Sequence, residues 1–217
     1  MGKFLLLLFC LSVPWRAMPQ DERYFRQLFS GELSRDKGAG GGEKKYSYYI
    51  HTPYYQIDLN RDNNPEELIF VKKDSEDWIE IFEKKSGERK KIFSYQFETK
   101  GYDSELYRIE MKKLSDTASV LILYYYEGVS KYTEMQSTSR VYAITIDKND
   151  LKSLASFKGP SFFEEGKSLK GHYHIRNYQV YLKDLNGDGA KELVVKFHLT
   201  SQVFIYEGSG KWRTFAN

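Results

Sequence analysis

The feature that most constrains the fold is a repeated pattern of short strand, acidic loop, short strand, turn and short strand. The first copy covers residues 55–87 and the last covers 178–210, and both end in a Ser-Gly turn. A degenerate middle copy covers 108–144, and its loop, Leu114-Ser115-Asp116-Thr117, is shortened and has lost the carboxylate series. In repeat architectures each unit buries its apolar face only against its neighbours. The pattern therefore predicts three structural units of one kind.

Residues 45–217 read almost entirely as strands and turns. The chain has 18 Tyr, 14 Phe and 3 Trp, and Ile79–Phe82 and Tyr142–Ile146 show period-two character. Such runs are typical of short strands with one buried face. We predict an all-β, antiparallel repeat architecture: an incomplete propeller of about three blade-like units, a stack of sheets, or a sandwich. The strands are expected at 46–50, 54–57, 68–71, 78–82, 91–97, 106–111, 120–126, 140–146, 178–182, 193–197, 203–206 and 212–215.

The segment between the middle and last copies is harder to interpret. Leu151–Phe157 fits either a strand or a brief helix, and Gly159-Pro160 is typical of a loop. Glu164-Glu165 is also expected in a loop, where adjacent carboxylates are usually solvated.

The first residues predict export. Met1-Gly2-Lys3 is cationic and Phe4–Val13 is apolar, which is too short to span a membrane but suits a signal peptide over residues 1–17, with an uncertain cut site. We expect a periplasmic, cell-surface or extracellular protein with no transmembrane segment after signal removal. Cys10, the only cysteine, leaves lipid anchoring open as an alternative to simple removal. Without disulfides, an exported domain depends on its core, on metal, or on both.

Residues 18–44 are expected to form a polar leader and a Gly-rich linker ahead of a β-repeat domain at 45–217. The net charge is +3, with Lys and Arg interspersed among Asp and Glu. The charged residues around Ser86-Gly87 indicate a solvated hairpin end. Because no basic stripe is visible, nucleic acid is not an expected partner.

The last acidic loop has the composition of a cation site. Counting from Asp184, oxygen-bearing side chains fall at positions one, three, five and nine, Gly189 at position six permits a sharp turn, and the position-seven carbonyl adds an oxygen. Six to eight oxygens in irregular geometry suit Ca²⁺ better than Mg²⁺. Val195 at position twelve excludes an EF-hand. The predicted ligands are Asp184, Asn186, Asp188, the carbonyl of Ala190, and Glu192.

The first acidic loop repeats this spacing with less regularity. Asn63 replaces the glycine but tolerates a left-handed backbone. Pro65 changes the path of the chain out of the loop, so that Glu67 is an alternative to Glu66 as the ligand near position nine. An Asx-rich turn without metal is the alternative for either loop. The second, weaker predicted set is Asp58, Asn60, Asp62, Asn64 and Glu66.

The string Asp-Leu-Asn-Gly-Asp-Gly-x-x-Glu-Leu-Val-Val resembles the calcium loop of FG-GAP or VCBS repeats, which occur in integrin α-subunit propellers and many exported bacterial proteins. The resemblance implies that both ligand sets bind Ca²⁺ and that the chain has a propeller-like fold. It covers the first and last copies well and the middle one only in outline. The Phe-Gly and Gly-Ala-Pro signatures are missing, and three units are fewer than the four to eight blades of a closed propeller.

Nothing in the sequence indicates a catalytic centre. His172 and His174 share a strand face without further ligands at a fixed spacing, and the tyrosine runs 46–49 and 124–126 are expected mainly in sheet packing. The sequence thus favours a non-catalytic, calcium-stabilised binding or structural module with a protein or glycan partner. A secreted hydrolase with acidic residues assembled from separate repeats is the alternative. A structural accessory subunit that self-associates to complete a propeller is a third hypothesis.

Overall fold

The structure is a computed structural model that describes residues 46–49, 54–85, 87–99, 103–131, 134–167 and 173–215, all within the compact unit Glu43–Asn217. The predicted signal peptide, the leader and linker, Cys10 and His172 lie outside the described residues.

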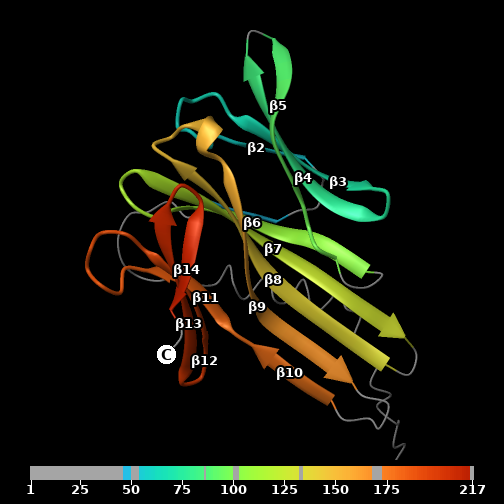
Figure 1. The fold of residues 1–217 in the computed structure, drawn as a ribbon. Helices are drawn as coiled ribbons and strands as arrows, with labels where there is room; N and C mark the ends of the chain where they lie inside the picture. The colour runs from blue at the N-terminus through green and yellow to red at the C-terminus, as the bar shows by residue number, and fades with distance from the viewer. Residues whose placement is uncertain are drawn as a thin grey trace, which may run out of the picture. The chain divides into compact units, whose positions relative to one another are not determined.

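The described residues form three antiparallel sheets, which confirms the all-β, antiparallel prediction (Figure 1). The N-terminal sheet consists of β2 (Tyr54–Ile57), β3 (Glu66–Lys73), β4 (Glu76–Lys85) and β5 (Glu88–Gln96). The middle sheet consists of β1 (Tyr46–Tyr49), β6 (Asp103–Lys113), β7 (Ala118–Lys131), β8 (Glu134–Asp147), β9 (Ala155–Lys167) and β10 (Tyr173–Asn177). The C-terminal sheet consists of β11 (Gln179–Lys183), β12 (Glu192–Phe197), β13 (Thr200–Gly208) and β14 (Lys211–Phe215).

Each copy of the sequence repeat spans three consecutive strands, and a fourth strand follows it and pairs in chain order in the same sheet. The first copy spans β2–β4 and is followed by β5, the middle copy spans β6–β8 and is followed by β9, and the last spans β11–β13 and is followed by β14. The middle sheet is wider because β1 pairs with the outer edge of β6 and β10 pairs with β9. Every predicted strand overlaps an observed one, whereas β10 and most of β9 were not predicted.

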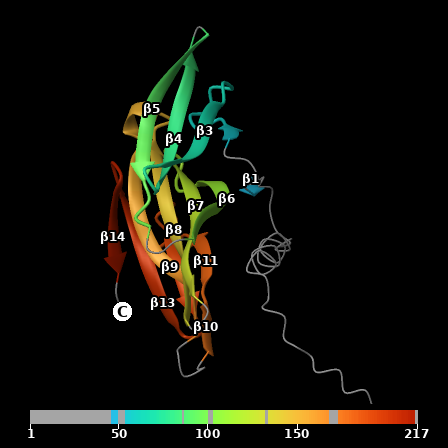
Figure 2. The same ribbon diagram turned by 90° about the vertical axis from the view of Figure 1, so that its right-hand side faces the viewer.

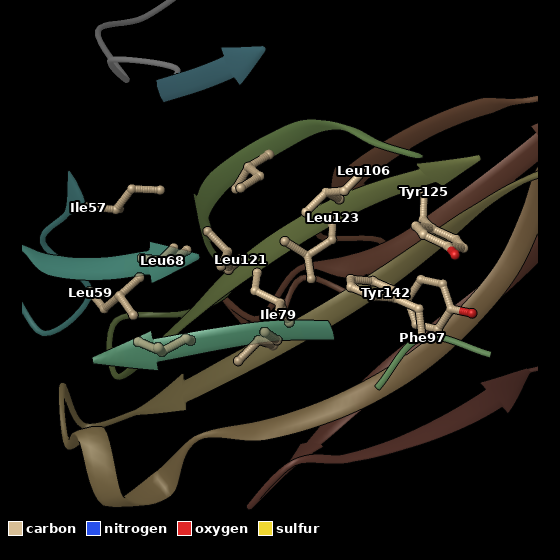
Figure 3. Close-up of a cluster of buried hydrophobic side chains, with 13 residues drawn as sticks. Ile57, Leu59, Leu68, Ile79, Phe97, Leu106, Leu121, Leu123, Tyr125 and Tyr142 are labelled. Carbon is tan, nitrogen blue, oxygen red and sulfur yellow. The ribbon is translucent and has the colours of Figure 1, made fainter. Parts of the chain in front are cut away.

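The middle sheet packs against a neighbour on each face. Along β7, Leu121, Leu123 and Tyr125 belong to the core shared with the N-terminal sheet, part of which Figure 3 shows. The alternate residues of the same strand belong to the core shared with the C-terminal sheet. Because successive strand residues point to opposite faces, a strand buried on both sides is apolar at nearly every position. The tyrosines at 124–126 are accordingly all buried, as the packing interpretation predicted.

Two loop predictions in β9 were wrong. Gly159-Pro160 lies within the strand, at a point where the pairing of β8 with β9 shifts register. A Cβ on Gly159 would lie 2.8 Å from the Val141 carbonyl oxygen, and the Arg140 Nη1 donates to the Gly159 carbonyl at 2.7 Å. Glycine and proline are tolerated in strands at such irregularities. Glu164-Glu165 also lies within β9, paired with β10.

Two further local predictions concern residues 151–157 and the charged hairpin end around Gly87. Leu151–Ser153 forms a 3₁₀ turn capped by the Asp150 side chain, which accepts from the Lys152 amide at 2.9 Å, and β9 begins at Ala155. The β4–β5 hairpin extends beyond the other strands in both views (Figures 1 and 2). The last residue pair of this hairpin is Lys85 with Glu88, which agrees with the predicted charged hairpin end.

Candidate metal-binding loops

The two acidic loops occupy equivalent places in the two outer sheets. Residues 58–65 connect β2 to β3, and residues 184–191 connect β11 to β12. Each loop therefore joins the edge strand of a sheet to the strand beside it. The corresponding connection in the middle sheet is residues 114–117, between β6 and β7.

In the C-terminal loop the predicted ligand side chains turn toward the backbone of the loop itself. The Asp184 carboxylate accepts from the amides of Gly187 at 2.6 Å and Gly189 at 3.0 Å. The Asp188 carboxylate accepts from the Ala190 amide at 2.7 Å and from the Asn186 side-chain amide at 2.8 Å. These bonds orient the oxygens at positions one, three and five around one curled segment.

The N-terminal loop has nearly the same hydrogen bonds, except that its first aspartate accepts from the amide at position five instead of position four. The Asp58 carboxylate accepts from the amides of Asp62 at 3.1 Å and Asn63 at 3.0 Å. The Asp62 carboxylate accepts from the Asn64 amide at 2.7 Å and the Asn60 side-chain amide at 2.9 Å. The sequence repeat is thus also a repeat of local geometry.

The backbone of both loops enters the left-handed region at positions four and six. In the C-terminal loop these are Gly187 (φ 78°) and Gly189 (φ 86°), whereas in the N-terminal loop they are Arg61 (φ 63°) and Asn63 (φ 66°). Glycine adopts this conformation without strain, and other residues do so at a cost of about 1–2 kcal/mol, with asparagine least penalised. The irregular N-terminal copy therefore keeps the curl of the C-terminal one.

The glutamates at position nine are the buried members of the two sets. Glu66 is 2 % exposed and Glu192 is 3 % exposed. Each accepts a hydrogen bond of 2.8 Å from the amide at position two, Leu59 in one loop and Leu185 in the other. This bond ties the start of each loop to the first residue of the following strand.

Negative charge accumulates in the N-terminal loop. Burial raises the pKa of the Glu66 carboxyl, and the Asp62 and Asp58 carboxylates raise this pKa further, while the Leu59 amide lowers it. Hydrogen bonds from the Asn60 side chain and the Asn64 amide lower the pKa of Asp62. Since a divalent cation would offset this repulsion, the electrostatics of the residues fit such an ion.

The geometry limits how a cation would be held. Among the residues that the structure describes, no three His, Cys, Asp or Glu side chains lie close enough together to hold a metal ion. The two Asp184 carboxylate oxygens each accept from one loop amide, and a carboxylate oxygen has a further lone pair to offer. Coordination would thus need the carboxylates to move closer together while keeping their amide bonds.

The middle loop is closed by other means. The Ser115 hydroxyl accepts from the amides of Thr117 at 3.3 Å and Ala118 at 3.1 Å, and Lys113 pairs with Asp116 at 2.6 Å. A hydroxyl turn and an ion pair thus replace the acidic series, which agrees with the degenerate sequence of this copy.

Both acidic loops contact the middle sheet through residues that sequence reasoning missed. The Lys191 amide donates to the Leu114 carbonyl at 2.8 Å, and the Arg61 guanidinium donates to the Ser119 hydroxyl at 3.2 Å. Neither bond follows from ligand spacing, because each depends on the stacking of separate sheets. Each bond therefore links an acidic loop to the neighbouring sheet.

The other polar groups singled out by sequence or burial lie outside the acidic loops. His174 lies in the exposed strand β10. Between the N-terminal and middle sheets, the buried Tyr125 hydroxyl donates to the Asp77 carboxylate at 2.7 Å and contacts the Thr99 hydroxyl at 2.6 Å. Burial raises the pKa of Tyr125 well above its ordinary value, so this hydroxyl stays protonated and links the two sheets.

Comparisons with family models, with characterised proteins and with solved structures found no match for this chain. Within the described ranges, none of the helical segments has the length and apolar character needed to cross a membrane.

Proposed function

We propose that this chain is an exported, calcium-stabilised β-repeat module with a binding or structural role at the cell surface, in the envelope or outside the cell. The observation that carries the proposal is the recurrence of one loop geometry, with three oxygen-bearing side chains and a buried glutamate, in the two outer sheets. An accidental Asx-rich turn would have no reason to recur with nearly the same bonds at equivalent places.

Calcium would be held by protein oxygens in both loops. In the C-terminal loop these are the side chains of Asp184, Asn186, Asp188 and Glu192 and the carbonyl of Ala190. In the N-terminal loop they are Asp58, Asn60, Asp62, the carbonyl of Asn64, and Glu66. The bound ion would supply positive charge that offsets the gathered carboxylates, and its role would be structural.

The proposal includes a propeller-like organisation of about three blade-like units related to FG-GAP or VCBS repeats. Three consecutive four-stranded meanders that stack face to face support it, since propeller blades have this form. A protein or a glycan is the proposed partner, because interspersed charges of both signs do not suit nucleic acid.

The test is thermal unfolding of the full chain with calcium and with excess chelator. At a calcium concentration of about 100 times Kd, one site adds about 2.7 kcal/mol, or roughly 5–10 °C in Tm for a domain of this size. The Asp184→Ala/Asp188→Ala variant should lose part of this response, and Asp58→Ala/Asp62→Ala should lose the rest.

The matched control is Asp116→Ala, which removes an exposed aspartate from the middle loop and should leave the calcium response intact. If calcium does not change Tm and direct metal analysis finds none bound, the acidic loops are turns only and the proposal is wrong.

A further inference from the structure

We propose that two copies of this chain associate through the outer edge of β10, which joins their middle sheets into one continuous antiparallel sheet around a two-fold axis at Ile175. The proposal does not depend on calcium, because it rests on β10, a strand that lies outside the three copies of the repeat and away from the acidic loops in sequence.

The strand β10 is the last strand of the middle sheet and, in the described part of the chain, pairs only with β9 (Figure 1). All five of its residues are exposed. Two of them are large and apolar, Tyr173 at 53 % and Ile175 at 44 % exposure. Unpaired backbone groups beside exposed apolar side chains make an edge that another strand can extend.

Three of the other sheet edges carry features that hinder such pairing. Along β5 lie Lys90 and Lys91 and a register shift against β4, and along β14 lie Lys211 and Arg213 and a register shift against β13. The edge strand β2 has only four residues. Lysines, bulges and short length are the usual protections of an edge. The strand β10 has no lysine, no proline and no register shift against β9.

The strand β10 is held in place by its contacts with β9. The His174 ring lies over Gly166, where a Cβ would come within 2.6 Å of the imidazole Cε1. The Tyr173 hydroxyl donates to Glu165, and Arg176 pairs with Glu164 at 3.7 Å. The edge is therefore presented as a formed strand, so a partner does not have to bear the entropy of ordering it.

The residue order of β10 favours a second copy as the partner. Antiparallel pairing centred on Ile175 places this residue opposite its own copy, His174 opposite Arg176, and Tyr173 opposite Asn177. No arginine faces another arginine, and Tyr173 and Ile175 of both copies share one face of the joined sheet. The same operation on β14 would place Arg213 against itself, which like-charge repulsion disfavours.

The first experiment measures the mass of the full chain by sedimentation equilibrium over a range of concentrations. We expect a monomer–dimer equilibrium. Ile175→Lys should raise the dimer dissociation constant by about tenfold or more, because it removes an apolar pair and opposes two ammonium groups. The matched control, Phe215→Lys, changes a residue of similar exposure (48 %) on β14 and should leave the constant unchanged.

A cysteine trap tests the register in a Cys10→Ser background. Ile175→Cys should form a disulfide across the axis under mild oxidation, whereas Tyr173→Cys alone should not, because its copy lies about 13 Å away along the strands. Tyr173→Cys combined with Asn177→Cys should cross-link again. A chain that stays monomeric, or a Phe215→Lys effect equal to that of Ile175→Lys, would overturn the proposal. A monomer that captures extended peptides at β10 would mean that the edge serves a different partner.

Discussion

Replacing Gly210 with alanine tests how the C-terminal sheet packs on the middle sheet. Gly210 lies in the β13–β14 turn with φ 75°, and a Cβ there would lie 2.2 Å from the Cβ of Ala155 at the start of β9. The left-handed backbone costs about 1–2 kcal/mol for alanine, and relieving the overlap costs about 1–3 kcal/mol more. We therefore expect Gly210→Ala to destabilise the protein by about 2–5 kcal/mol.

Two further variants separate these costs in denaturant or thermal unfolding. Gly208→Ala has φ 87° and nothing within 4 Å of the added Cβ, so it should cost only the backbone part, about 1–2 kcal/mol. Ala155→Gly should relieve the overlap, which makes the double variant with Gly210→Ala about 1–3 kcal/mol more stable than additivity predicts. Additive effects of the two changes, or equal costs at Gly208 and Gly210, would refute the packing of this turn against β9.

The loops and an ion-pair cluster yield three more predictions. Gly189→Asn should leave the calcium-dependent Tm nearly unchanged, since Asn63 occupies the same position in the other loop, whereas Gly189→Val should lower it. Lys191→Pro should lower Tm by roughly 2–4 °C, for about 1 kcal/mol, because the amide bond to the middle sheet is lost. It should keep the calcium response, because Pro65 shows that the loop accepts proline at this position. Hydrogen bonds from two lysines lower the pKa of Glu80, so its contribution to stability is present above the unfolded-state pKa and is lost as pH falls through the folded-state pKa. Glu80→Gln should accordingly lower Tm at pH 7 and have little effect at about pH 2, measured by thermal unfolding across pH.

The sequence was sufficient for the outer sheets because their signals are local. In the N-terminal sheet, Ile79 and Ile81 are buried while Lys84 and Lys85 at the hairpin end are exposed, so the apolar positions and the turn composition agree with the fold. The acidic spacing also predicted the equivalence of the two loops, since Asp58 and Asp184 each accept a hydrogen bond from the amide at position six. Local hydrogen bonds of this kind depend on few residues that are close in sequence.

The middle sheet was harder to predict because its pattern depends on tertiary contacts. In β9, Gly159 is required by the close Val141 carbonyl on β8, a contact that no local reading contains. Glu164 and Glu165 suggested a solvated loop, yet their partners Arg176 and Tyr173 lie on β10, an added strand outside the repeat. Tertiary pairing overrode local propensity in both segments.

The distribution of the acidic loops follows the distribution of apolar burial. The middle strand β7 is buried along most of its length by packing on both faces, and its preceding loop needs only a hydroxyl turn and an ion pair. The outer strands β2 and β11 are short, partly exposed edge strands, and each is the strand that an acidic loop ties to its neighbour. Apolar burial contributes least to the stability of these edge strands, so a loop held by a cation would contribute most there. This arrangement is expected of a domain without disulfides whose described sheets do not close into a ring.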